Sequence, residues 1–83
     1  MKITVRYFAS IREVMGTGSE SLQTAAATVG ALRTELMDKS EAAAQALVEG
    51  KAVRMALNQN MCNSAAALKS GDEVAFFPPV TGG

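Results

Sequence analysis

The 83-residue sequence contains no histidine and no tryptophan, and Cys62 is its one cysteine. A lone cysteine excludes a disulfide within the chain and a cysteine-ligated iron–sulfur centre. The lack of histidine also excludes a Cys/His metal cluster and a Ser-His or Cys-His catalytic pair. We expect Cys62 to be a small, half-buried hydrophobic residue rather than a reactive thiol. The sequence therefore indicates a protein without catalytic equipment of its own.

An excess of charge of one sign is also missing, because eight lysine and arginine residues balance eight aspartate and glutamate residues. A neutral chain without a basic run has no electrostatic attraction for nucleic acid or for an anionic membrane. The uncharged segment over residues 21–32 contains Gln, Thr and Gly, and it cannot span a bilayer. Lys2 and Arg6 stand where a signal peptide needs apolar residues. We expect a cytoplasmic protein with no nucleic-acid and no membrane partner.

Hydrophobic residues make up 48% of the chain, enough for the core of one small domain. Alternating side chains predict strands over residues 2–8, 52–58 and 73–77. A polar and weakly alternating strand is expected over residues 19–24, at an edge of the sheet. Residues 61–68 fit neither a helix nor a strand clearly. The buried face of the first strand would carry Ile3, Val5 and Tyr7.

Three helices are predicted from capping residues and apolar spacing. Ser10 and Glu13 match a capping box, which predicts a short helix that stops at Gly16–Gly18. Thr28 is expected to cap a second helix, although Gly30 in its first turn costs up to about 1 kcal/mol against alanine. Ser40 would open a third helical segment over residues 41–48. The apolar stripe of the second helix consists of Val29, Leu32, Leu36 and Met37.

The order of these elements predicts an α+β fold. A hairpin, a helix across one face of a mixed sheet and then further strands form the ubiquitin-like β-grasp arrangement. In that arrangement the first and last strands lie parallel at the centre of the sheet. We expect one β-grasp domain over residues 1–77, followed by a flexible C-terminal tail over residues 78–83.

The tail differs in composition from the rest of the chain. Pro78 and Pro79 end the last strand and favour an extended path, whereas Gly82 and Gly83 have no side chains. A frayed terminus is the simpler interpretation of a Gly-Gly end. A stiff segment that projects a thin end could also thread a narrow channel. A partner enzyme could then use ATP to activate the carboxylate of Gly83.

Several segments are similar to one known family. The most specific segment is residues 68–83, Leu-Lys-Ser-Gly-Asp-Glu-Val-Ala-Phe-Phe-Pro-Pro-Val-Thr-Gly-Gly. Asn58-Gln59 after an alternating strand, Val5-Arg6-Tyr7-Phe8-Ala9 and Thr28-Val29 also match. The chain resembles the small subunits of molybdopterin synthase, in the MoaD/ThiS family of sulfur carriers. The resemblance covers nearly the whole chain and is least specific over residues 39–51.

The resemblance implies a mechanism in which Gly83 carries sulfur. An E1-like enzyme would use ATP to adenylate Gly83, and a sulfur-donating enzyme would convert the adenylate to a thiocarboxylate. The large subunit of molybdopterin synthase, in a heterotetramer, would use two such sulfurs to build molybdopterin from cyclic pyranopterin monophosphate. Its side chains would be the catalytic ones, and the small subunit would bind no cofactor. Gly82 would give access to the active site, and Pro78 and Pro79 would direct the tail.

The residues also predict a surface that binds a partner. Phe8 and Phe77 fall on the faces of their strands opposite the core residues, so parallel neighbouring strands would bring both rings together. The resemblance places Met61 beside them. A small apolar cluster beneath a loop is the alternative interpretation. The predicted partner-binding residues are Phe8, Met61, Phe77, Pro78, Pro79, Val80 and Thr81.

Three alternatives to a molybdopterin sulfur carrier remain open. A sulfur carrier of thiazole biosynthesis would share the fold and the tail chemistry but would have another acceptor. A ubiquitin-like modifier would join lysines through Gly83. An interaction module would have an inert tail. The ending Phe-Phe-Pro-Pro-Val-Thr-Gly-Gly favours molybdopterin.

Overall fold

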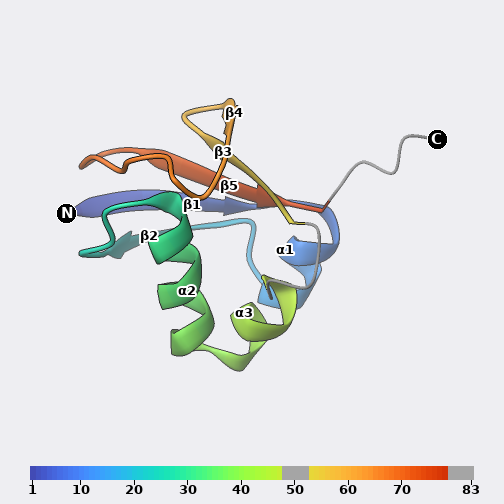
Figure 1. Cartoon of the computed structure of the whole chain (residues 1–83). Helices are drawn as coiled ribbons and strands as arrows, with labels where there is room; N and C mark the ends of the chain where they lie inside the picture. Colours follow the sequence, from blue (N-terminus) through green and yellow to red (C-terminus); the bar gives the residue numbers. More distant parts are fainter. Residues whose placement is uncertain (48–52, 79–83) are drawn as a thin grey trace.

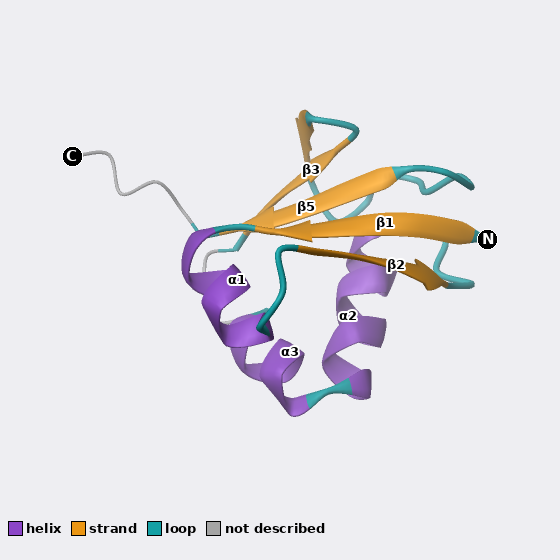
Figure 2. Cartoon of the chain, turned by 180° about the vertical axis from the view of Figure 1, so that it is seen from behind, coloured by secondary structure: helices purple, strands orange, loops and turns teal. Residues whose placement is uncertain are grey.

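The computed structural model describes residues 1–47 and 53–78. Five strands form one sheet in the order β2-β1-β5-β3-β4, and the helices lie together on one of its faces (Figures 1 and 2). The strands are β1 (Lys2–Tyr7), β2 (Ser19–Gln23), β3 (Arg54–Leu57), β4 (Asn60–Cys62) and β5 (Glu73–Phe77). The helices are α1 (Ala9–Met15), α2 (Val29–Lys39) and α3 (Glu41–Ala46).

The strand pairing confirms the predicted mixed sheet. β1 pairs antiparallel with β2 on one side and parallel with β5 on the other, and β5 lies in the middle of the five strands. β3 then pairs antiparallel with both β5 and β4. The predicted edge strand is β2, whose burial pattern is half-buried and exposed in turn. The first and last strands are therefore parallel neighbours, as the order of elements predicted.

The core lies between the sheet and the helices. Ile3, Val5 and Tyr7 of β1 are buried as predicted, and Val74 and Phe76 of β5 are fully buried beside them. The rings of Tyr7 and Phe76 stack with centroids 6.4 Å apart. Burial of each large apolar side chain stabilises the fold by about 1.5–3 kcal/mol. Alternation therefore directs β1 and β5 to one shared core face.

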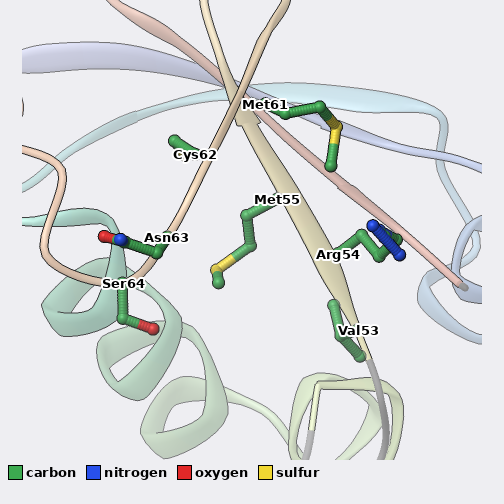
Figure 3. Close-up of a pocket in the computed structure, with 7 residues that line it drawn as sticks. All are labelled: Val53, Arg54, Met55, Met61, Cys62, Asn63 and Ser64. Carbon is green, nitrogen blue, oxygen red and sulfur yellow. The ribbon is translucent and has the colours of Figure 1, made fainter.

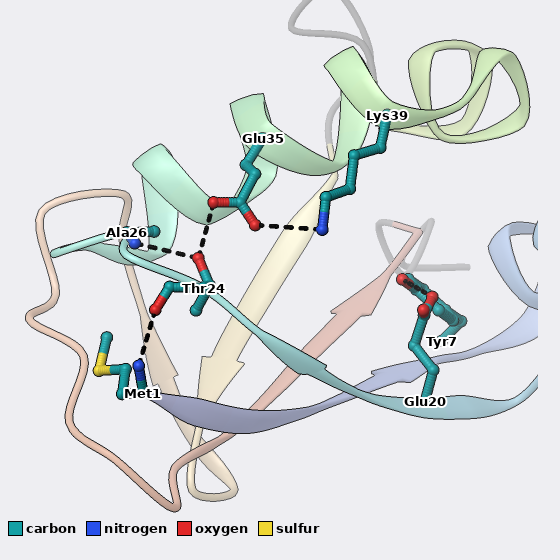
Figure 4. Close-up of polar contacts among 7 residues, drawn as sticks. All are labelled: Met1, Tyr7, Glu20, Thr24, Ala26, Glu35 and Lys39. Carbon is teal, nitrogen blue, oxygen red and sulfur yellow. Dashed lines mark hydrogen bonds and ion pairs between the residues drawn. The ribbon is translucent and has the colours of Figure 1, made fainter.

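Four hydrogen bonds lie at the β2 side of the sheet (Figure 4). The Tyr7 hydroxyl donates a 2.7 Å hydrogen bond to Glu20, and its burial together with this bond raises the pKa of Tyr7 far above the ordinary range. The Thr24 hydroxyl donates at 2.7 Å to Glu35 of α2 and accepts from the Ala26 N–H at 3.0 Å. The α-ammonium of Met1 donates to the Thr24 carbonyl at 3.0 Å. The bond from Thr24 to Glu35 ties α2 to the end of β2, and the bonds of Tyr7 and Met1 hold the N-terminal strand beside β2.

The predicted caps of α2 and α3 are confirmed. The Thr28 hydroxyl accepts from the Ala31 N–H at 3.1 Å, and the Ser40 hydroxyl accepts from the Ala43 N–H at 3.0 Å. Such caps typically contribute about 1 kcal/mol each. The stripe expected on α2 faces the core, with Val29, Leu32 and Leu36 buried and Met37 packed against them.

The predicted capping box at the start of α1 is wrong. Phe8 is the N-cap, no side chain caps the helix, and Ser10 lies inside the first turn. The Phe8 carbonyl accepts from the N–H groups of Ile11 and Arg12, while its own N–H still pairs with Phe76 of β5. Only Phe8 separates β1 from the helix, which begins at Ala9, one residue before the expected cap Ser10. Gly16 ends it in the left-handed conformation, as the glycine predicted.

The structure explains why glycine occupies position 30. A Cβ atom there would lie 2.9 Å from the Ser64 Cβ and 3.0 Å from the Ser64 carbonyl oxygen. The Gly30 N–H donates to that carbonyl at 2.9 Å, and the Val29 N–H donates to Ala66 at the same distance. The segment after β4 thus satisfies the free N–H groups of the helix, which compensates for the poor helix propensity of glycine.

The same segment resolves the ambiguity of residues 61–68. It begins as β4, turns after Cys62 and returns beneath α2, where Ala67 forms an isolated bridge with Thr28. The conformation of this segment depends on its contacts with α2, because its apolar residues follow neither the helical nor the strand period. The predicted extension of the third helix to Val48 and the predicted strand start at Ala52 lie outside the described residues.

Candidate functional site

The face of the sheet opposite the helices carries the candidate site, and we term it the open face. Its residues point away from the core because side chains alternate along each strand. Opposed pairs in the register, such as Arg54 with Phe77 and Ala56 with Met61, share this face. The open face comprises Lys2, Thr4, Arg6, Phe8, Arg54, Ala56, Met61, Glu73, Ala75 and Phe77.

Two aromatic rings meet on the open face where β1 and β5 end. Tyr7 pairs with Phe76 in the parallel register, so Phe8 and Phe77 are the next pair along. Their rings pack edge to face, with centroids 6.3 Å apart and an interplanar angle of 87°. Phe8 is 39% exposed and Phe77 is half-buried, so no loop of the described chain covers the pair. The predicted juxtaposition of the two rings is confirmed, whereas their role in binding stays a prediction.

Arg6 extends this aromatic pair into a mixed polar and apolar surface. Its guanidinium carbon lies 5.5 Å from the centroid of the Phe8 ring, within the range of a cation–π contact. One guanidinium nitrogen lies 4.0 Å from a carboxylate oxygen of Glu73, and both side chains are partly exposed. An exposed pair of this kind contributes at most about 1 kcal/mol. Arg6 therefore has intramolecular partners on both sides.

Met61 lies on the open face at the opposite edge of the sheet. The register runs from Met61 through Ala56 and Ala75 to Arg6, so two small side chains separate Met61 from Arg6. Met61 is 58% exposed, more than the other large hydrophobic residues of the described chain. An exposed methionine can adapt its shape to a partner. The register supports the placement of Met61 on the face of Phe8 and Phe77.

The C-terminal tail begins at the aromatic pair. Pro78 is half-buried and directly follows Phe77. Pro79, Val80, Thr81, Gly82 and Gly83 lie outside the described residues, so their predicted roles stay predictions.

Cys62 lies at the edge of the sheet, in a pocket of about 380 Å³ lined by residues of β3 and β4 and the residues that follow β4 (Figure 3). Burial raises the pKa of this thiol, which keeps it protonated and weakly nucleophilic at neutral pH. Residues 1–47 and 53–78 contain no group of three acidic or cysteine side chains that could hold a metal ion. Within the same residues, no helix is long and apolar enough to cross a membrane.

Comparison with known proteins identifies the family. The sequence model of the ThiS family matches residues 5–83. The chain belongs to the ThiS family. Two curated relatives, both named molybdopterin synthase sulfur carrier subunit, match over 98% of this chain and 99% of their own length. The Haemophilus influenzae protein is 43% identical over 81 residues, and the Escherichia coli protein is 44% identical over 81 residues.

Other relatives of this ThiS-family chain have other names. Small archaeal modifier protein 3 of Haloferax volcanii is 34% identical over 92 residues and is matched over the full length of both chains. The crystal structure of SAMP1 from Haloferax volcanii superimposes with a TM-score of 0.77 at 27% identity, with full coverage of both chains. A chain in the complex of subunits 1 and 2 of molybdopterin-converting factor from Helicobacter pylori superimposes with a TM-score of 0.70 at 28% identity, again with full coverage of both chains. These neighbours confirm the predicted ubiquitin-like β-grasp fold.

Sequence reasoning missed a set of hydrogen bonds that holds β3 against β5 in this family member. The Asn58 amide donates to the Asp72 carboxylate at 3.0 Å and accepts from the Glu73 N–H at 3.0 Å. The Lys69 N–H donates to the other Asp72 oxygen at 2.7 Å. The bond from Asn58 and that from the Lys69 backbone lower the pKa of Asp72. Asn58 and Gln59 both have positive φ, which the tight β3–β4 turn requires.

Proposed function

We propose that the chain is the sulfur carrier of molybdopterin synthase, active in the cytoplasm in molybdenum cofactor biosynthesis. The observation that carries this proposal is the exposed Phe8–Phe77 pair, placed where the Gly-Gly tail leaves the sheet. An apolar surface at that point suits a partner that receives the tail in its active site. The two curated relatives that match 98% of the chain carry the name of this function.

The chemistry proposed for Gly83 needs an activated carboxylate. A carboxylate oxygen attacks the α-phosphate of ATP on an E1-like enzyme, pyrophosphate leaves, and an acyl-adenylate forms. A sulfur nucleophile at the oxidation level of hydrosulfide, delivered by a sulfur-donating enzyme, attacks the acyl carbon. AMP leaves with the bonding electron pair, and a thiocarboxylate remains. Gly82 adds no bulk beside the reacting carbon, and Pro78 and Pro79 direct the tail.

The proposed acceptor complex contains the large subunit of molybdopterin synthase. The solved complex of subunits 1 and 2 of molybdopterin-converting factor includes a chain of the same fold. In our proposal the large subunit binds the open face through Phe8, Met61 and Phe77 and the tail through residues 78–81, in a heterotetramer. The large subunit supplies the catalytic side chains, and the carrier donates sulfur to cyclic pyranopterin monophosphate. ATP acts only on the activating enzyme, and the carrier itself holds no cofactor.

Intact-mass measurement tests the proposal. The chain is incubated with the E1-like enzyme, ATP and a sulfur source, and it should gain the mass difference between sulfur and oxygen. Peptide mapping should place this change at Gly83. Cys62→Ser serves as the control and should gain the same mass. Sulfur found on Cys62, with none at Gly83, would contradict the proposed mechanism.

A ubiquitin-like modifier is the second candidate, and its support is the similarity to Small archaeal modifier protein 3. In that case Gly83 would form an isopeptide bond with a lysine of another protein. The chain would then appear in covalent species of higher mass, and reducing agents would not cleave the bond. A carrier of thiazole biosynthesis would show the thiocarboxylate but would not support molybdopterin formation with the large subunit.

A further inference from the structure

Arg54 is an exposed cation of the open face at the start of β3. It pairs with Phe77 in the antiparallel register of β3 and β5, so it flanks the ring at the start of the tail. Figure 3 shows the side chains of Arg54 and Met61 on one side of β3 and that of Met55 on the other. Arg54 therefore lies between two of the apolar residues that the proposed interface uses.

The guanidinium of Arg54 has no ion pair or cation–π contact within the described residues, in contrast to that of Arg6. Arg6 is held by Glu73 and by the ring of Phe8. The charge on the described part of the open face is also unbalanced, because one carboxylate, that of Glu73, stands against Lys2, Arg6 and Arg54. Among residues 1–47 and 53–78, Arg54 is thus the cation beside Phe77 without a charged or aromatic partner.

A partner that covers Phe77 and Met61 must also remove Arg54 from water. An unpaired guanidinium in such an interface is strongly unfavourable, whereas a carboxylate can accept two parallel hydrogen bonds from it. We propose that Arg54 is a specificity-determining residue of the open face and that it binds an aspartate or glutamate side chain of the large subunit. This inference rests on the proposed function, because that function supplies the partner.

The pocket beside Arg54 has the volume to admit such a side chain. It measures about 380 Å³, and Arg54 and Met61 contribute to its wall on the open-face side. Asn63 and Ser64 add polar groups, while Val53 and Met55 add apolar surface. A carboxylate carried on methylene groups would place its chain against Met61 and its charge at Arg54. The pocket and the unpaired cation therefore indicate the same acidic partner residue.

Binding to the large subunit from the same organism tests this inference. The dissociation constant is measured by calorimetry at low and high salt for the wild type and for Arg54→Glu, Arg54→Ala and Lys2→Glu. We expect Arg54→Glu to weaken binding by about tenfold to a hundredfold, and Arg54→Ala by less. Lys2→Glu makes the same charge change at the far end of the same face, and it should change binding less than about threefold. Equal losses for both reversals would show general attraction and would overturn the specific contact.

A crosslink identifies the partner group directly. In the complex of Arg54→Lys, a water-soluble carbodiimide should join the new amine to a carboxylate of the large subunit. An amide forms, and the carbodiimide takes up the water that is lost and becomes a urea. Mass spectrometry should find position 54 linked to an aspartate or glutamate. A well-formed complex without this link would contradict the proposal.

Two further outcomes separate this inference from the proposed function. If Phe77→Asp weakens the complex and Arg54→Glu does not, the open face binds the large subunit but Arg54 has no acidic partner there. If the wild-type chain does not bind the large subunit at all, the proposed function itself fails. A dimer of the free chain that Arg54→Glu dissociates would place a second copy at this face and overturn the inference.

Discussion

Replacement of Phe77 by aspartate should damage partner binding far more than folding. In the free protein the change removes the edge-to-face contact with Phe8, which contributes about 0.5–1.5 kcal/mol. The new carboxylate would lie opposite Arg54 in the register, which offsets part of that loss. In a domain of this size, each kcal/mol of lost unfolding free energy lowers the melting temperature by about 4–8 °C. We therefore expect the melting temperature to fall by about 10 °C or less.

In the complex the same carboxylate would be buried and would compete for Arg54 with the acidic side chain proposed there, so one of the two carboxylates would lose its partner. An uncompensated charge in an interface costs about 3–5 kcal/mol, which corresponds to a hundredfold or greater loss of affinity. Thermal denaturation and calorimetric titration with the large subunit measure the two effects separately. Phe76→Asp is the matched control, because Phe76 is the fully buried neighbour in β5 and its replacement should unfold the domain. If Phe77→Asp unfolds the protein to the same extent, the assignment of Phe77 to the open face is wrong.

Three other predictions concern the tail, the helix start and the hydrogen bonds of β5. Deletion of Gly83 should abolish the mass gain from sulfur and leave the melting temperature unchanged, since a terminal residue contributes little to a core. Molybdopterin formation by the deletion variant would refute the carrier mechanism. Gly30→Ala should destabilise the domain by about 1–3 kcal/mol in urea titrations despite its better helix propensity, because the added Cβ meets Ser64 at 2.9 Å; a stabilised variant would show that the loop yields. The hydrogen bonds from the Asn58 side chain and the Lys69 backbone lower the pKa of Asp72 from its ordinary 3.8. The stability that the ionised Asp72 contributes is therefore complete above about pH 4, and it is lost as the pH falls through the folded-state pKa. Asp72→Asn should make the unfolding free energy less dependent on pH in this acidic range, and an unchanged pH profile would contradict this assignment.

Much of the local structure could be predicted because its causes are local. The hydroxyl groups of Thr28 and Ser40 reach N–H groups three residues ahead, so each cap depends on a few neighbouring residues. Alternation of apolar residues in β1 and β5 identifies the buried face without knowledge of what covers it. The same alternation predicted that Phe8 and Phe77 point away from the core. Only the parallel pairing of their strands had to be inferred from the order of elements.

Predictions failed where a distant segment determines the conformation. Ser10 has the sequence of a cap, but the pairing of Phe8 with Phe76 carries β1 up to the first helical residue and places Ser10 inside the turn. Gly30 has a poor helix propensity, but Ser64, more than thirty residues later in the chain, occupies the space that a side chain at position 30 would need. Neither contact has a periodic signal, because each depends on how two segments pack in three dimensions.

By itself, the sequence determined most of the helices and strands and the buried faces of β1, β5 and α2. These follow from residue types and short spacings, which the linear order of the chain contains. The tertiary structure alone decided which charged side chains pair with one another on the open face. It gave Arg6 its partners Glu73 and Phe8, and it left Arg54 beside Phe77 without an ion pair among the described residues. The physical reason is that an ion pair depends on a distance of a few ångströms between groups far apart in the chain.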